Sequence, residues 1–150
     1  MAGKRSGGPW YGNFRDRLLF EGETFQVFKD IQVVQEHNRK LAGRVYRLTV
    51  EVPEYGNRRI EIRFAGTRHP VIFSDGPTDS PHRFRDDSLC IWWGRDDPQR
   101  KWVFADGLLE LIGLTIIHLF KEAWWRETGE WLGEEAPHGT GPKDREEERS

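Results

Sequence analysis

Two stretches in which apolar and polar residues alternate constrain most strongly what this chain can fold into. They run from Arg44 to Val52 (RVYRLTVEV) and from Arg58 to Phe64 (RRIEIRF). The alternating apolar positions are Leu48, Val50 and Val52 in the first stretch and Ile60, Ile62 and Phe64 in the second. A period of two predicts half-buried β-strands. Residues 53–57 (PEYGN) carry the Pro and Gly of a turn, so the two strands are expected to pair as a hairpin.

Two further segments extend this hairpin into a meander. Phe25 to Gln35 (FQVFKDIQVVQ) is rich in β-branched and aromatic residues, which favours a strand. Pro70 to Phe73 (PVIF) predicts a short strand that follows the hairpin. The sequence therefore indicates an antiparallel meander of three to four strands, with one apolar face that needs a cover.

A long helix near the end of the chain supplies that cover. Asp106 is a plausible N-cap, and the apolar run behind it continues towards Gly129, which is expected to end the helix. From Leu108 to Phe120 the helix is apolar nearly all round, which is typical of a buried helix. Strands followed by helices make the fold class α+β.

Length and composition limit the organisation and the partners. A chain of 150 residues suits one domain, expected over residues 10–138, with a disordered N-terminus (1–9) and a disordered charged tail (139–150). A formal net charge of −2 leaves no basic footprint for nucleic acid. The longest apolar stretch is too short to cross a bilayer, so no membrane partner is expected.

The cysteine and histidine content narrows the chemistry. A single cysteine, Cys90, excludes an internal disulfide and fits a reducing compartment, so a cytoplasmic location is expected. No signal-peptide pattern is present at the N-terminus. No two histidines stand at metal-ligand spacing, and no Gly-rich phosphate loop follows a strand, so neither metal nor cofactor is expected. His118 is interpreted as a core histidine.

Cys90 lies in a long polar segment from Ser74 to Lys101, and loops of that length inside a domain are usually functional. Free cysteines often only pack in the core. The position in a polar loop instead favours a nucleophile whose thiol is at least partly accessible. His82, Arg83 and Arg85 are nearby groups that could favour its thiolate. A lone Cys with an upstream His also fits a Cys-His hydrolase, although no third orienting residue is evident.

This order of elements resembles the ubiquitin-conjugating (UBC) fold. In that family a histidine, proline and asparagine precede the active cysteine, and the asparagine stands eight positions before it. Here His82 occupies the position of the asparagine, and the run Asp86-Asp87-Ser88-Leu89-Cys90-Ile91 resembles the family's approach to the cysteine. Trp102 resembles the tryptophan that follows the active-site loop. The resemblance implies a UBC-like fold with the active-site loop between sheet and helices.

Two segments make the resemblance more specific. Residues 81–93 (PHRFRDDSLCIWW) and 124–138 (WWRETGEWLGEEAPH) are similar to ubiquitin-conjugating-like proteins of type II CBASS operons, which are antiphage systems built around a cyclic-oligonucleotide synthase. The family's N-terminal helix is expected to be short here, over residues 13–20, which puts docking of an activating enzyme in doubt.

The resemblance implies that Cys90 forms a thioester with the C-terminus of a partner protein. The implied partner is the synthase of the same operon, and the acyl group would pass to Lys or Cys acceptors on target proteins. His82 would orient or stabilise the intermediate. The alternative is a non-catalytic scaffold of the same fold that binds the synthase.

Overall fold

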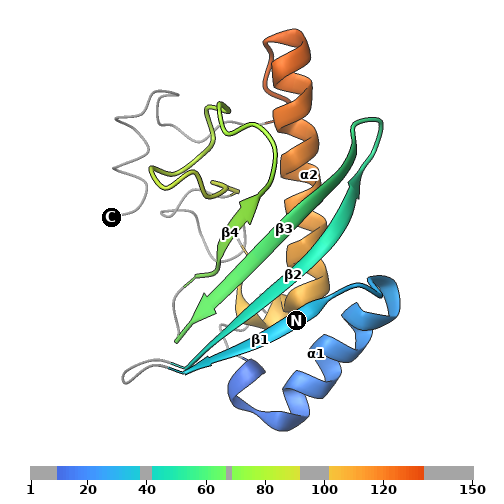
Figure 1. Cartoon of the computed structure of the whole chain (residues 1–150), viewed down its shortest axis with the longest axis vertical. Helices are drawn as coiled ribbons and strands as arrows, with labels where there is room; N and C mark the ends of the chain where they lie inside the picture. Colours follow the sequence, from blue (N-terminus) through green and yellow to red (C-terminus); the bar gives the residue numbers. More distant parts are fainter. Residues whose placement is uncertain (1–9, 38–41, 67–68, 92–101, 134–150) are drawn as a thin grey trace, which may run out of the picture.

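The computed structural model describes residues 10–37, 42–66, 69–91 and 102–133. Along the chain its elements are η1 (Trp10–Gly12), α1 (Phe14–Val27), β1 (Gln32–His37), β2 (Ala42–Val52), β3 (Gly56–Ala65), β4 (Val71–Ser74), η2 (Phe104–Asp106) and α2 (Gly107–Thr128) (Figure 1). The expected disordered ends, residues 1–9 and 139–150, lie outside the described residues.

The four strands form one antiparallel sheet in the order β1-β2-β3-β4, so the predicted meander is confirmed. In the central pair, Leu48 lies opposite Ile60. Both side chains are buried, as the alternation requires. The turn between β2 and β3 is closed by a hydrogen bond of 3.0 Å from the Tyr55 N–H to the Val52 carbonyl oxygen.

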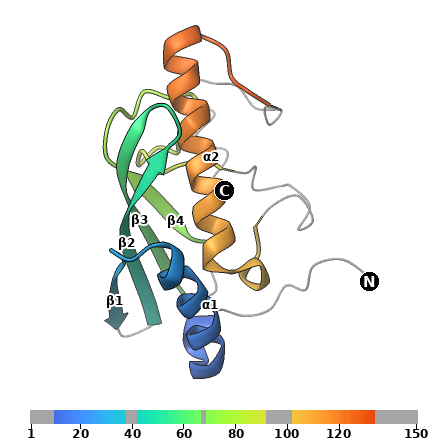
Figure 2. The same cartoon turned by 90° about the vertical axis from the view of Figure 1, so that its right-hand side faces the viewer.

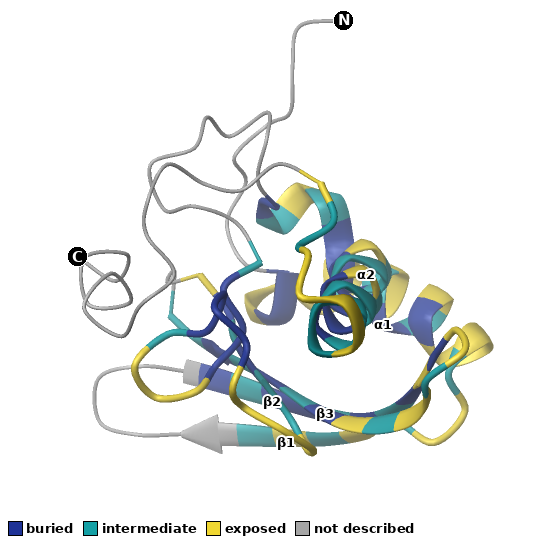
Figure 3. Ribbon diagram, turned by 90° about the horizontal axis from the view of Figure 1, so that it is seen from above, coloured by how far each residue is buried: buried dark blue, intermediate teal, exposed yellow. Residues whose placement is uncertain are grey.

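Both long helices lie on the same face of the sheet (Figure 2). Buried residues gather between the sheet and the helices (Figure 3). The buried side chains that α2 contributes to this layer include Leu108, Leu111, Ile112 and Leu119. Each such side chain contributes roughly 1.5–3 kcal/mol by leaving water. One exception to the predicted all-round burial is Ile117, which is 53% exposed because it lies on the outer side of α2.

Aromatic side chains join the N-terminal turn to the sheet and to the start of α2. The Trp10 ring lies 4.9 Å from the Phe64 ring and 5.7 Å from the Trp102 ring, measured between centroids. Trp102 is buried and donates a hydrogen bond of 2.8 Å from Nε1 to the carbonyl oxygen of Gly107. This cluster fixes the chain where α2 begins.

The N-terminal helix is longer than expected, and the strand predicted over Phe25 to Gln35 is wrong in its first part. Residues up to Val27 belong to α1, and β1 begins only at Gln32. The side chain of Asn13 caps α1 by accepting a hydrogen bond of 3.1 Å from the Asp16 N–H. Glu21, from the buried side of α1, pairs with Arg44 of β2, which ties the helix to the sheet.

The predicted C-terminal helix is confirmed as α2. It ends at Gly129, whose φ of 81° is left-handed and whose N–H donates to the Trp125 carbonyl oxygen at 2.7 Å. Asp106 stands at the N-cap position, but its carboxylate accepts from the Val103 N–H at 2.9 Å. The sheet with its C-terminal helix makes the fold α+β and UBC-like. No helix within the described ranges is long and apolar enough to span a bilayer.

Candidate functional site

The segment from His82 to Cys90 forms a small antiparallel hairpin. Its two sides meet at a bridge between Arg83 and Leu89, and the Phe84 N–H donates to the Ser88 carbonyl oxygen at 2.8 Å. The turn is completed by Asp87, whose φ of 69° is left-handed, a conformation that Asp tolerates better than most residues. Part of the segment predicted as one long loop is therefore ordered by its own backbone.

The hairpin is attached to the sheet beyond β4. The Leu89 N–H donates a hydrogen bond of 2.8 Å to the Ile72 carbonyl oxygen, so the second side of the hairpin continues beside β4. Figure 1 shows this segment, in yellow-green, beside the upper half of α2. The sheet and the helix thus position the hairpin from two directions.

The hairpin brings the two predicted site residues together. The Cys90 N–H donates a hydrogen bond of 3.0 Å to the His82 carbonyl oxygen. Cys90 is 7% exposed and His82 is 5% exposed. The expectation that the thiol is partly accessible is therefore wrong in this conformation. The physical reason is that the segment, although polar in sequence, folds back against β4 and α2 instead of extending into solvent.

The imidazole of His82 lies against Trp131, which follows α2. The two ring centroids are 4.1 Å apart, and the Trp131 ring also lies 5.4 Å from the ring of His118. Trp131 thus covers the His82 ring from the C-terminal side. The far end of the 124–138 motif, residues 134–138, lies outside the described residues.

His118 is buried, as predicted for a core histidine, but it also contacts the candidate site. Its Nε2 lies 3.2 Å from the His82 carbonyl oxygen and 3.4 Å from Glu122 Oε2. Because both neighbouring atoms are hydrogen-bond acceptors, Nε2 is the ring nitrogen that carries the proton. The His82 carbonyl therefore accepts from α2 as well as from Cys90.

A buried ion pair fixes the first side of the hairpin to α2. Arg83 donates from Nε to Glu122 Oε2 at 2.6 Å and from Nη2 to Oε1 at 2.7 Å. Both side chains are 1% exposed. Burial alone would raise the pKa of Glu122, but the hydrogen bonds from His118 and Arg83 and the electrostatic attraction of these groups outweigh it and lower the pKa to about 2. Glu122 is therefore an anion in this site.

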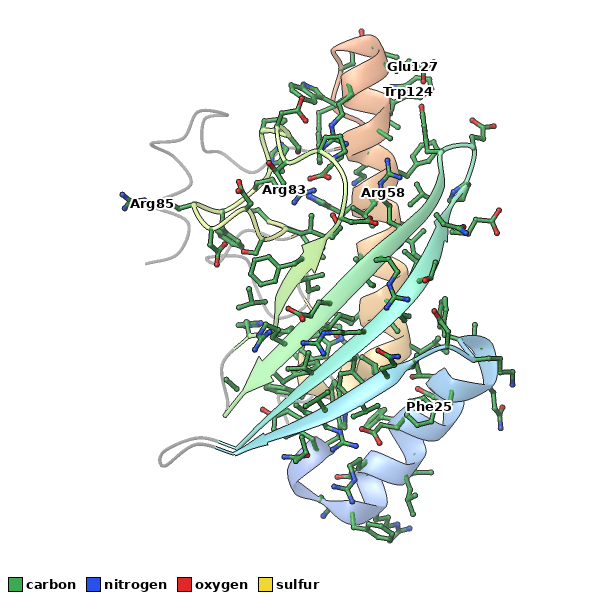
Figure 4. All side chains as sticks on the ribbon, viewed as in Figure 1. Phe25, Arg58, Arg83, Arg85, Trp124 and Glu127 are labelled. Atoms are coloured by element: carbon green, nitrogen blue, oxygen red, sulfur yellow. The ribbon has the colours of Figure 1, made fainter. Side chains whose placement is uncertain are left out.

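The other donors of Arg83 hold the surrounding loops. Its Nη1 donates to the Asp87 carbonyl oxygen at 2.7 Å, and its Nη2 approaches Ser74 Oγ and the Pro77 carbonyl oxygen at 3.2 Å each. Arg83 is one of the three groups that the sequence offers as able to favour the thiolate of Cys90, and each of its guanidinium nitrogens donates to another residue. Figure 4 shows Arg83 directed towards α2 and Arg85 directed away from the molecule.

The sequence interpretation missed Glu122 as a site residue. Its signal was spacing, because Leu111, Thr115, His118 and Glu122 recur at intervals of four, three and four residues. That interval marks one face of a helix, and all four side chains are buried. A carboxylate on a buried face requires a cationic partner, which Arg83 supplies.

No group of three or more His, Cys, Asp or Glu side chains among the described residues is arranged to hold a metal ion. The chemical groups of the site are a buried thiol, an imidazole at the base of the same hairpin, and a charged network behind them. A thiol is a nucleophile once it is deprotonated, and an imidazole can donate a hydrogen bond to a developing oxyanion.

Comparison with known proteins identifies the family. No curated protein and no solved structure matches the chain significantly. A family model described as "Type II CBASS E2 protein" matches residues 18–139, which include the hairpin and all of α2. This match gives the chain an E2-like role in CBASS. The chain belongs to the type II CBASS E2 protein family.

Proposed function

We propose that this protein is a conjugating enzyme that carries an acyl group on Cys90. The Cys90 thiolate attacks the C-terminal acyl group of a partner protein, which arrives activated as an acyl adenylate or as a thioester on another carrier; the AMP or the carrier thiolate leaves, and a thioester on Cys90 forms. An amine or thiol of the target then attacks the thioester and releases Cys90. The observation that carries the proposal is the hydrogen bond from Cys90 to His82 inside the hairpin of a UBC-like fold.

The partner that donates the acyl group is the cyclic-oligonucleotide synthase of the same operon, and the acceptors are Lys or Cys residues on target proteins. Membership of a CBASS family supports a partner encoded in the same operon. The resemblance of residues 81–93 to type II CBASS proteins supports the synthase in particular.

His82 stabilises the intermediate and forms no covalent bond in this scheme. It shares the base of the hairpin with Cys90, and Trp131 limits the orientations of its ring. An imidazole N–H held in a water-poor site stabilises an oxyanion more strongly than it would in water. His82 thereby takes the place of the asparagine found in related enzymes.

The burial of Cys90 adds a requirement. Reaction needs the acyl carbon within roughly 3–3.5 Å of the sulfur, and a 7% exposed residue does not offer that space. Binding of the partner's C-terminus must therefore displace groups that cover the thiol. The enzyme opens its site when the substrate arrives.

The experiment is co-expression with the synthase, followed by non-reducing electrophoresis and mass spectrometry. A conjugate that thiol reductants release, with its cross-link on Cys90, supports the proposal. Cys90→Ala should abolish this conjugate, and Cys90→Ser should retain an oxyester that reductants do not release. A conjugate formed at wild-type yield by folded Cys90→Ala would overturn the proposal.

The second candidate is a non-catalytic scaffold that binds the synthase, and the burial of Cys90 favours it. The two functions differ in what the cysteine does. A scaffold keeps both synthase binding and antiphage protection in Cys90→Ala, whereas the conjugating enzyme keeps binding and loses protection.

A further inference from the structure

We propose that Glu122 is a positioning residue for Cys90. Through Arg83 and His118, Glu122 holds the first side and the turn of the hairpin 82–90 against α2 and keeps the site closed. The kinetic part of this inference rests on the proposed function, but the structural part does not.

The contacts of Glu122 reach the first side of the hairpin and its turn. On the first side, Oε1 and Oε2 accept from the Arg83 guanidinium at 2.7 and 2.6 Å. Oε2 also lies 3.4 Å from Nε2 of His118, which in turn reaches the His82 carbonyl oxygen. At the turn, the same Arg83 donates to the Asp87 carbonyl oxygen at 2.7 Å. One carboxylate thus orients the two groups that bind the hairpin backbone.

Arg126, at the edge of the same network, adds a further contact to Glu122. Arg126 lies 3.5 Å from Glu122 Oε1, donates to Asp79 Oδ1 at 2.6 Å, and donates to the Pro77 carbonyl oxygen at 2.9 Å. The segment between β4 and the hairpin is therefore held by the same carboxylate. Every charged group that faces Glu122 in these contacts comes from α2 or from residues 79–83.

The network has a role that apolar packing could not fill. Burying an ion pair gains little stability over apolar side chains of the same volume, whereas hydrogen bonds fix geometry. The tip of the hairpin, residues 85–87, is exposed and adds no core packing. Leu89, on the second side, packs in the core and binds β4, so the first side and the turn are the parts of the hairpin that the Glu122 network holds beside α2.

Two measurable properties of Cys90 should then move in opposite directions when the network is broken. A loosened hairpin exposes the thiol more often, so a small reagent reacts faster. The same loosening disturbs the alignment of Cys90 with His82, so transfer of the acyl group slows. A residue that only added stability would change neither property in protein that remains folded.

The test variant is Glu122→Gln, and Glu21→Gln is its matched control. Glu21 belongs to another largely buried Arg–Glu pair, which joins α1 to β2 and, within the described part of the chain, makes no hydrogen bond or ion pair with the hairpin. The measurement is the rate of Cys90 alkylation by iodoacetamide from pH 7 to 9, well below the melting midpoint of each variant. Alkylation of Glu122→Gln should be about tenfold faster than wild type, as local opening allows. Glu21→Gln should stay within about twofold of wild type.

Equal alkylation rates in Glu122→Gln and Glu21→Gln would overturn the inference. If Glu122→Gln does not fold, Arg83→Lys takes its place. That substitution keeps the positive charge opposite Glu122 but removes the guanidinium fork that binds the Asp87 carbonyl. The same roughly tenfold acceleration is expected, and an unchanged rate in folded Arg83→Lys would count equally against the inference.

Kinetic measurements distinguish a failure of this inference from a failure of the proposed function. If the wild-type protein forms the Cys90 conjugate, Glu122→Gln should lower kcat with little change in KM, and an unchanged kcat would contradict the positioning role. If the wild-type protein forms no conjugate, the proposed function fails, and the alkylation rates still decide whether Glu122 positions Cys90.

Discussion

The backbone N–H of Cys90 donates a hydrogen bond of 3.0 Å to the carbonyl oxygen of His82. These residues stand eight positions apart in the sequence, and a turn at Asp87 returns the chain so that they lie opposite each other. The bond uses only backbone atoms, so a change in either side chain leaves it in place. The two side chains can therefore be tested separately.

We expect His82→Ala to slow conjugation by roughly a hundred- to a thousandfold without abolishing it, as happens when one oxyanion donor is lost. The hairpin should persist because the backbone bond to Cys90 remains. The measurement is conjugate yield against time, with melting curves to show that the variant is folded. Wild-type rates in folded His82→Ala would end the role given to this imidazole.

The stability that Glu122 provides should disappear in acid. The pKa of Glu122 is lowered from 4.5 to about 2, so the unfolded chain takes up the proton first as pH falls. The contribution is complete above pH ~4.5 and is lost as pH falls through about 2. A pKa lowered by this amount corresponds to about 3 kcal/mol of unfolding free energy that ionised Glu122 contributes.

Chemical denaturation of wild type and Glu122→Gln between pH 6 and pH 2 measures this contribution. The difference in unfolding free energy should shrink towards acid pH, and carboxylates common to both proteins cancel from that difference. Parallel curves over the whole range would show that Glu122 is not held as an anion by its neighbours.

Truncation of the α2 core should separate its buried and outer faces. Leu111 is fully buried, so Leu111→Ala should cost ~2–5 kcal/mol of unfolding free energy. Ile117 is 53% exposed, so Ile117→Ala should stay within about 0.5 kcal/mol of wild type. Denaturant titration of both variants checks this, and equal costs would mean that the helix face is misassigned.

Replacing two glycines of α2 by alanine should change the free energy of unfolding in opposite directions. Gly107 has φ +88°, and a Cβ there would meet Phe20 Cδ1 at 2.8 Å, so Gly107→Ala should destabilise by roughly 2–5 kcal/mol. Gly113 lies inside the helix with nothing within 4 Å of an added Cβ, so Gly113→Ala should stabilise by about 1 kcal/mol. Thermal denaturation of the two variants measures whether each substitution stabilises or destabilises the protein.

Much of the fold could be predicted because β2, β3 and α2 bury a regular face. Alternation at Leu48 and Ile60 produced the correct strands, and the apolar run behind Asp106 produced the correct helix. The N-terminal helix was expected only over residues 13–20, because the later part of α1 leaves apolar residues such as Phe25 and Val27 exposed while burying Glu21. A helix with that distribution has no apolar stripe to detect.

The sequence proposes residues for the candidate site but does not give their geometry. Spacing could not place His82 beside Cys90, because their register depends on the left-handed conformation of Asp87, which no local pattern specifies. Arg83 was interpreted as a group near the thiol because it is close in sequence. Its true partner, Glu122, lies 39 residues away, and only tertiary packing brings the two together.

That separation also has a consequence in time. A ribosome adds roughly 5–20 residues each second, so Glu122 is synthesised roughly 2–8 seconds after Arg83. Until α2 has been made and docked, the nascent chain carries its cysteine on a segment that lacks its anchor on that helix. The thiol should therefore react with oxidants and small electrophiles more readily before the last helix has docked than in the folded protein, where it is buried.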